Sequence, residues 1–183
     1  MGPTPWLTAV FSDKGPNAVE LTLAAPGLTG SEVVGRWYFN LNPELNPANL
    51  IFTETSFSGI FTTPMALTGA DAFKPDYDGK YDILLNFDTP GDLNQRFTGG
   101  DSITYNITGI GGLKADDFLF GNTPAAGHEP FYTAASIQTI GEAVILDRVR
   151  VPDASQTVIL LGFGLLALEG ARRRLDTCRC PRG

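Results

Sequence analysis

Hydrophobic and polar residues alternate along most of the first 150 residues of this 183-residue chain. Successive side chains of a β-strand point to opposite faces, so this period of two is typical of strands with one face in a core and one in water. The clearest alternating segments are 19–23, 36–41, 80–88 and 102–108. Further strands are predicted at Leu7–Phe11, Leu50–Phe57, Ala134–Ile140 and Ala143–Val149.

Turn-forming residues separate these segments, because Gly, Pro, Asn and Asp accept or preset the backbone angles of tight turns. The main turn signals are 13–16, 26–27, 78–79, 90–92 and 99–101. Helical periodicity is not sustained before residue 150, although 114–118 could form a single turn. Short strands without intervening helices predict an all-β body, an antiparallel β-sandwich of jelly-roll type.

The pattern changes in the last thirty or so residues. Val158–Leu168 has no polar side chain, and Arg172, Arg173 and Arg174 follow closely. A helix that packs on a core should keep one polar face, which this segment lacks. As a helix, Thr157–Ala171 would be about 22 Å long, enough to cross a bilayer only if the bilayer thins or the arginines reach toward the interface. The flanking arginines favour a single C-terminal membrane helix over the alternative, a helix packed on the body.

The motif Val151-Pro152-Asp153, the apolar segment and the three arginines follow one another in a tripartite order. This order resembles the PEP-CTERM sorting domain, in the variant whose motif begins Val-Pro-Asp, and the resemblance covers 151–175. It implies a bacterial protein held in the inner membrane until an exosortase, an integral-membrane cysteine transpeptidase, cuts near the motif. It implies that Val151, Pro152 and Asp153 are recognition residues and that Arg172, Arg173 and Arg174 are a cytoplasmic membrane stop.

The resemblance also implies a domain organisation and a location. We expect a β-sandwich ectodomain at 1–150, a sorting and anchor segment at 151–175 and a short tail at 176–183. The body itself looks like ectodomains that often precede such a segment, notably at 37–43, 78–83, 97–101, 105–109 and 134–138. The expected location is the cell surface or the extracellular matrix. Because export needs a signal peptide, and 1–6 has neither a basic region nor an apolar one, we expect it to be encoded upstream of Met1.

Charge divides at the same border as the hydrophobic pattern. Residues 1–152 hold 17 acidic and 8 basic residues, a net charge of −9, and the remainder holds 3 acidic and 5 basic, a net charge of +2, which together give −7. Proteins that bind nucleic acid gain affinity when Lys and Arg neutralise phosphates. An acidic body therefore excludes nucleic acid as the expected partner.

Candidate catalytic residues are few. The chain has one histidine, His128, and its two cysteines, Cys178 and Cys180, both lie after the arginines. A serine or cysteine nucleophile needs a base and an orienting acid, and no Gly-x-Ser-x-Gly motif is present. A glycosidase with two carboxylates stays open, because such a pair assembles only in the fold. We predict that the body is not an enzyme.

Asp76, Asp78 and Asp82 form the most suggestive metal-binding pattern. Three carboxylates around Gly79 could converge on Ca²⁺, which prefers several oxygen ligands. The alternative is a hairpin turn at Asp78-Gly79 that leads into the strand at 80–88, with Asp82 on its wet face. We favour the hairpin and expect no cofactor.

The resemblance to the PEP-CTERM sorting domain implies an exported surface or matrix protein, and we expect a structural or adhesive role for its β-sandwich body. Its expected partners are an exosortase, the inner membrane and extracellular polysaccharide. The alternative is a secreted carbohydrate-binding β-sandwich module, with or without Ca²⁺.

Overall fold

The computed structural model describes residues 2–29, 31–75, 79–87, 95–126 and 129–139, and the backbone of 145–147. The chain divides into two units, Met1–Arg150 and Val151–Gly183. The second unit, which contains the predicted C-terminal helix, lies outside the described residues. The boundaries of the sorting segment and of the short tail therefore stay predictions.

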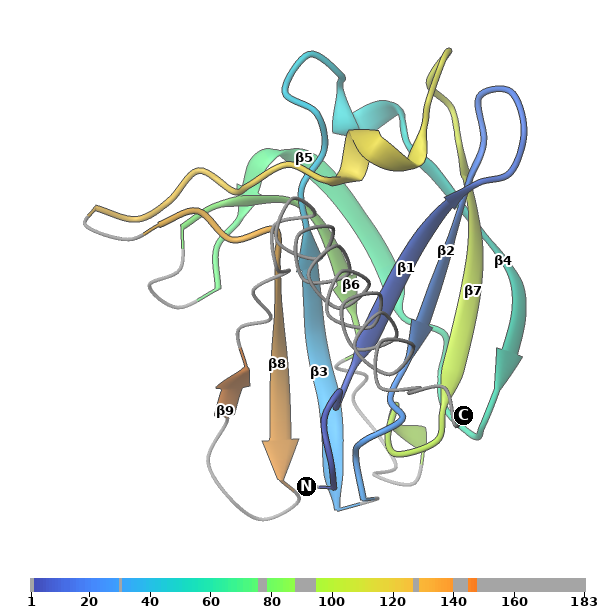
Figure 1. Ribbon diagram of the computed structural model, residues 1–183, viewed down its shortest axis with the longest axis vertical. Coiled ribbons are helices and arrows are strands. Elements are labelled where there is room, and N and C mark those ends of the chain that lie inside the picture. The colour runs from blue at the N-terminus through green and yellow to red at the C-terminus, as the bar shows by residue number, and fades with distance from the viewer. Residues whose placement is uncertain are drawn as a thin grey trace, which may run out of the picture. The chain divides into compact units, whose positions relative to one another are not determined.

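The body is built from two antiparallel β-sheets (Figure 1). The four-stranded sheet has the order β1-β2-β7-β4, and the five-stranded sheet has the order β5-β6-β3-β8-β9. The strands are β1 Thr8–Asp13, β2 Val19–Ala24, β3 Glu32–Phe39, β4 Ile51–Ser58, β5 Met65–Phe73, β6 Tyr81–Asn86, β7 Ser102–Thr108, β8 Thr133–Thr139 and β9 Ile145–Asp147. In the described connections lie the short 3-10 helices η1 (Pro47–Asn49) and η3 (Ala115–Phe118). The predicted all-β sandwich is confirmed.

When β5 and β6 are left out, the strand order is that of a known type of β-sandwich. The remaining strands read β1-β2-β7-β4 and β3-β8-β9. This is the order A-B-E-D and C-F-G of the seven-stranded immunoglobulin-type sandwich. The antiparallel pair β5–β6 extends the second sheet beside β3, with β6 paired to β3.

The main core lies between the two sheets, and the residues predicted to point inward supply it. Aromatic contacts join the sheets, since the rings of Phe11 on β1 and Phe39 on β3 meet edge to face with centroids 5.5 Å apart. Removing apolar area from water provides the largest favourable term in folding. The buried residues of the strands in this core are Val19, Leu21, Leu23, Val34, Trp37, Phe39, Ile83, Leu85, Ile103, Tyr105, Ile107, Ala135 and Ile137.

A second apolar cluster lies on the other side of the five-stranded sheet. Tyr38 and Tyr81 pack there with Phe131 and Ala134. Alternation predicts that Tyr38 and Asn40 face water, and this expectation is wrong, because both residues are buried. The amide nitrogen of Asn40 donates to the carbonyl oxygens of Phe131, at 3.2 Å, and Tyr132, at 3.1 Å. The segment before β8 thus covers this face.

Candidate functional site

Most of the residues singled out from the sequence lie outside the described part of the chain. They are the motif residues Val151, Pro152 and Asp153, the arginines Arg172, Arg173 and Arg174, His128, and the two carboxylates Asp76 and Asp78. Their predicted roles stay predictions. Asp82 and the carboxylates within the described ranges can be placed.

Asp82 on β6 uses both carboxylate oxygens inside the fold. Oδ2 accepts a hydrogen bond from the backbone nitrogen of Leu41 at 3.0 Å, and Oδ1 accepts one from the backbone nitrogen of Asp71 at 2.8 Å. Asp82 therefore joins the end of β3 to the bulge of β5 and does not simply face water. Asp71 in turn lies 3.7 Å from the ammonium nitrogen of Lys80. Among the described residues, no group of three or more His, Cys, Asp or Glu side chains could hold a metal ion.

Tyr105 on β7 and Glu54 on β4 lie opposite each other in the four-stranded sheet. The Tyr105 hydroxyl is buried and donates to the carbonyl oxygen of Pro64 at 3.5 Å. Burial, and to a lesser extent the charge of Glu54, raises the pKa of Tyr105 above its ordinary value of 10.0. A phenol that stays protonated cannot serve as a base at neutral pH. We therefore assign this pair a role in packing beside the edge strand β4 and not in catalysis.

The outer surface of the four-stranded sheet is rich in Ser and Thr. We call it the hydroxyl face and define it by the residues that register and burial place opposite the core. These are Thr8, Val10 and Ser12 on β1; Glu20, Thr22 and Ala24 on β2; Ser102, Thr104, Asn106 and Thr108 on β7; and Ile51, Thr53, Ser56 and Ser58 on β4. Among these described positions Glu20 is the charged residue, and Ser or Thr fills most of the others.

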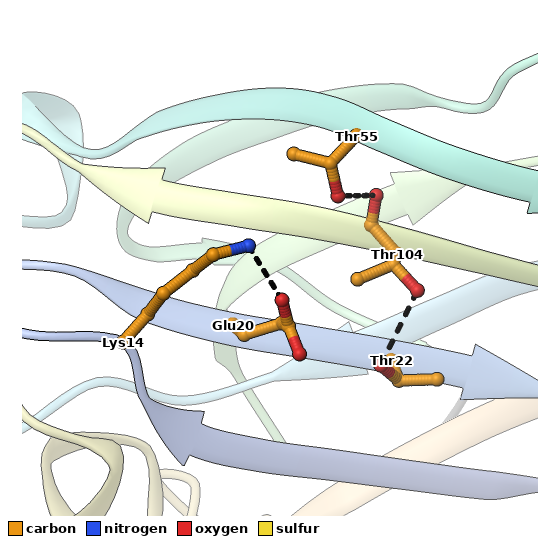
Figure 2. Close-up of polar contacts among 5 residues, drawn as sticks. All are labelled: Lys14, Glu20, Thr22, Thr55 and Thr104. Atoms are coloured by element: carbon orange, nitrogen blue, oxygen red, sulfur yellow. Dashed lines mark hydrogen bonds and ion pairs between the residues drawn. The ribbon is translucent and has the colours of Figure 1, made fainter.

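Contacts between strands hold several of these side chains in place (Figure 2). The hydroxyl oxygens of Thr22 and Thr104, on neighbouring strands, lie 3.3 Å apart. The hydroxyl of Thr55, at the bulge of β4, donates to the carbonyl oxygen of Thr104 at 3.2 Å. Lys14, from the turn between β1 and β2, pairs with Glu20 at 2.6 Å. Lys14 thus neutralises the charge of Glu20 from the adjoining turn.

The hydroxyl face cannot be predicted from the alternation pattern of any single strand. Alternation places Thr22 and Thr104 outward, but it does not pair them, because 82 residues separate them. The available signal is that the outward positions of 20–24 and 102–108 are mostly Ser, Thr and Asn rather than Lys and Glu. Only the β2–β7 pairing gathers these positions into one surface.

Comparison with known protein families gives a match in the C-terminal segment of the chain. Residues 150–175 match the model of the VPDSG-CTERM motif, a sorting signal of the PEP-CTERM type. The match covers the predicted motif, apolar segment and arginines, so the predicted sorting signal is confirmed. A motif of this type indicates an exported protein of the cell envelope.

The body gives weaker likenesses. No curated protein matches the chain. Among solved structures, a scaffoldin carbohydrate-binding module of family 3b from the cellulosome of Bacteroides cellulosolvens is similar, with 11% sequence identity and a TM-score of 0.37. The alignment covers 81% of this chain and 99% of that module.

The predicted membrane helix falls in the part of the chain that is not described. Within the described part, none of the helices is long and apolar enough to span a membrane.

Proposed function

We propose that this chain is an exported bacterial protein of the cell surface or the extracellular matrix, delivered through its C-terminal sorting segment. The observation that carries the proposal is the match of residues 150–175 to the VPDSG-CTERM motif. The apolar run Val158–Leu168 and the three arginines after it suit a helix that holds the chain in the inner membrane during export.

In this proposal an exosortase recognises Val151, Pro152 and Asp153 and cleaves nearby. The arginines Arg172–Arg174 stay on the cytoplasmic side and stop translocation, because positive residues near a membrane helix are retained there. Cleavage would then separate the β-sandwich from its anchor. The proposed role of the sandwich is structural or adhesive and non-catalytic.

A second candidate function, a carbohydrate-binding module, is favoured by the hydroxyl face. A broad surface of Ser and Thr hydroxyls with one internally neutralised charge suits an uncharged, hydrogen-bonding partner. The two candidates are compatible, since a matrix protein can attach by binding the polysaccharide around it.

The test is the location of the protein in a bacterial host that carries the sorting enzyme. Replacing Val151, Pro152 and Asp153 with Ala together should keep the protein at full mass in the membrane fraction. Replacing Asp176 and Thr177 with Ala, beyond the arginines, is the matched control and should leave delivery unchanged. Release of the motif variant at the wild-type rate and mass would reject sorting through this segment.

A further inference from the structure

We propose that the hydroxyl face of the four-stranded sheet binds an extended, uncharged polysaccharide. This proposal rests on the proposed function, because it names the class of polymer that the exported body would contact and the surface that contacts it. Its first basis is geometry. Four antiparallel strands spaced by about 4.8 Å, with outward residues repeating about every 7 Å along each strand, give an extended array rather than a pocket.

The second basis is charge. The chain has a net charge of −7, yet the described residues of the hydroxyl face contain one carboxylate, Glu20, and Lys14 neutralises it at 2.6 Å. An acidic protein repels anionic polymers over roughly a Debye length. A polymer that carries no charge meets no such repulsion, and it does not require the face to desolvate an unpaired ion. The charge distribution therefore complements a neutral partner.

The third basis is the chemistry of hydroxyl groups. A Ser or Thr hydroxyl both donates and accepts hydrogen bonds, as sugar hydroxyls do, so either group can replace the water around the other. The methyl groups of Thr22, Thr104 and Thr53 add apolar contact for the C–H surfaces of a sugar ring. Thr is β-branched and stiff about χ1, so that binding costs little side-chain entropy. Lys or Glu at the same positions would lose far more freedom.

An extended polymer fits this surface better than a single sugar does. A small ligand needs a concave site that buries most of its surface, whereas the hydroxyl face spreads its groups over four strands. Each contact is weak, and a polymer gains affinity by making many contacts at once. The cross-strand bond between Thr22 and Thr104, 3.3 Å between oxygens, lies within this array and orders its central rows.

The test uses the full-length protein in mild detergent and its co-sedimentation with insoluble, uncharged polysaccharides, namely cellulose, mannan and starch, and with alginate as an anionic comparison. We expect retention on at least one uncharged polymer, little effect of about 1 M salt, which screens exposed charges, and no retention on alginate. Retention by none of the uncharged polymers, or retention by alginate alone, would overturn the proposal.

Two variants locate the surface. Thr22→Val with Thr104→Val keeps the side-chain shape and removes two hydroxyls, and it should weaken binding roughly tenfold. Thr104→Lys places a long charged chain at the centre of the face and should abolish retention. Met65→Lys, on the exposed side of β5 in the other sheet, is the matched control and should bind as the wild type does.

Equal binding by the wild type and both hydroxyl-face variants, with melting temperatures unchanged, would overturn the assignment of this surface. A wild type that sediments as a dimer while Thr104→Lys sediments as a monomer would place the hydroxyl face between two copies of the chain and would overturn it as well. Delivery and cleavage in cells are measured separately. A protein that is sorted normally but retained by no polysaccharide would reject this inference and leave the proposed sorting function intact.

Discussion

The indole nitrogen of Trp37 on β3 donates a hydrogen bond to the hydroxyl oxygen of Thr133 on β8, at 3.0 Å. The same hydroxyl donates to the carbonyl oxygen of Tyr38 at 2.7 Å. Trp37 is 1% exposed, so water cannot take the place of this partner. One side chain of β8 therefore fixes the orientation of the largest residue in the core.

Thr133→Val should destabilise the body through this pair. Leaving a buried donor unsatisfied costs about 1–3 kcal/mol, while the shape of the side chain is preserved. Thr133→Ser keeps the hydroxyl and should lose less. Urea unfolding, followed by Trp fluorescence, measures both variants, and equal stability of the Val and Ser variants would show that the hydrogen bond contributes little.

Gly59 should be far less replaceable than Gly100, although both have positive φ, 119° and 87°. A Cβ at Gly59 would collide with the Asp101 carboxylate, whereas a Cβ at Gly100 meets nothing within 4 Å. Gly100→Ala should cost about 1 kcal/mol of backbone strain. Gly59→Ala carries that strain and also displaces Asp101, so its free energy of unfolding should fall further in thermal or urea unfolding. Equal losses for both would contradict this packing.

Asp101 should make stability depend on pH. Burial raises the pKa of this carboxyl above its ordinary value of 3.8, against a smaller lowering by the hydrogen bond from the Thr98 nitrogen at 2.8 Å. A raised folded pKa gives stability at low pH that is lost as pH rises through that value.

The matched variant is Asp101→Asn, which does not ionise and keeps an oxygen acceptor. The stability of the wild type relative to this variant should fall as the pH rises from the ordinary pKa of 3.8 through the raised pKa of the folded carboxyl. Urea midpoints measured across this range give the comparison. A difference that stays constant, or grows in favour of the wild type, would contradict the direction of the pKa shift.

Calcium should leave the melting temperature nearly unchanged, because Asp82 already accepts two backbone hydrogen bonds. A ligand at 100 times its dissociation constant would add about 2.7 kcal/mol to the free energy of unfolding and raise the midpoint by several degrees. Titration of Ca²⁺ in a thermal scan measures the shift. A rise of that size, abolished by Asp76→Asn with Asp78→Asn, would restore the alternative of a calcium-binding module.

The sequence predicts the strands that alternate cleanly and misses the strand that does not. β2, β6 and β7 carry bulky residues on one face, and period-two alternation is enough to place them. β5 was not predicted, because Met65–Phe73 is rich in Ala, Gly and Asp, residues that are poor strand formers. It forms as an edge strand by pairing with β6, and its register shifts between Thr68 and Phe73, where Asp71 takes a φ of 51°.

The candidate sites also differ in how far the sequence alone predicts them. The sorting segment is local in sequence, so its motif, apolar run and arginines can be read directly. The hydroxyl face and the burial of Tyr38 depend on which distant segments cover or adjoin a strand, and single-strand alternation does not contain that information. Asp82 could be placed on β6, but its bonds to Leu41 and Asp71 arise only when β3 and β5 flank that strand.

The C-terminal residue of the mature protein tests the central claim most directly. In cells with an active sorting enzyme, mass spectrometry of the delivered protein should find peptides of the body up to the region of Val151–Asp153 and none from Val158 onward. In cells whose sorting enzyme lacks its catalytic cysteine, peptides through Leu175 should persist in the membrane fraction. Delivered protein that keeps Val158–Leu168 in cells with the active enzyme would contradict the claim that this segment is a sorting signal removed by cleavage.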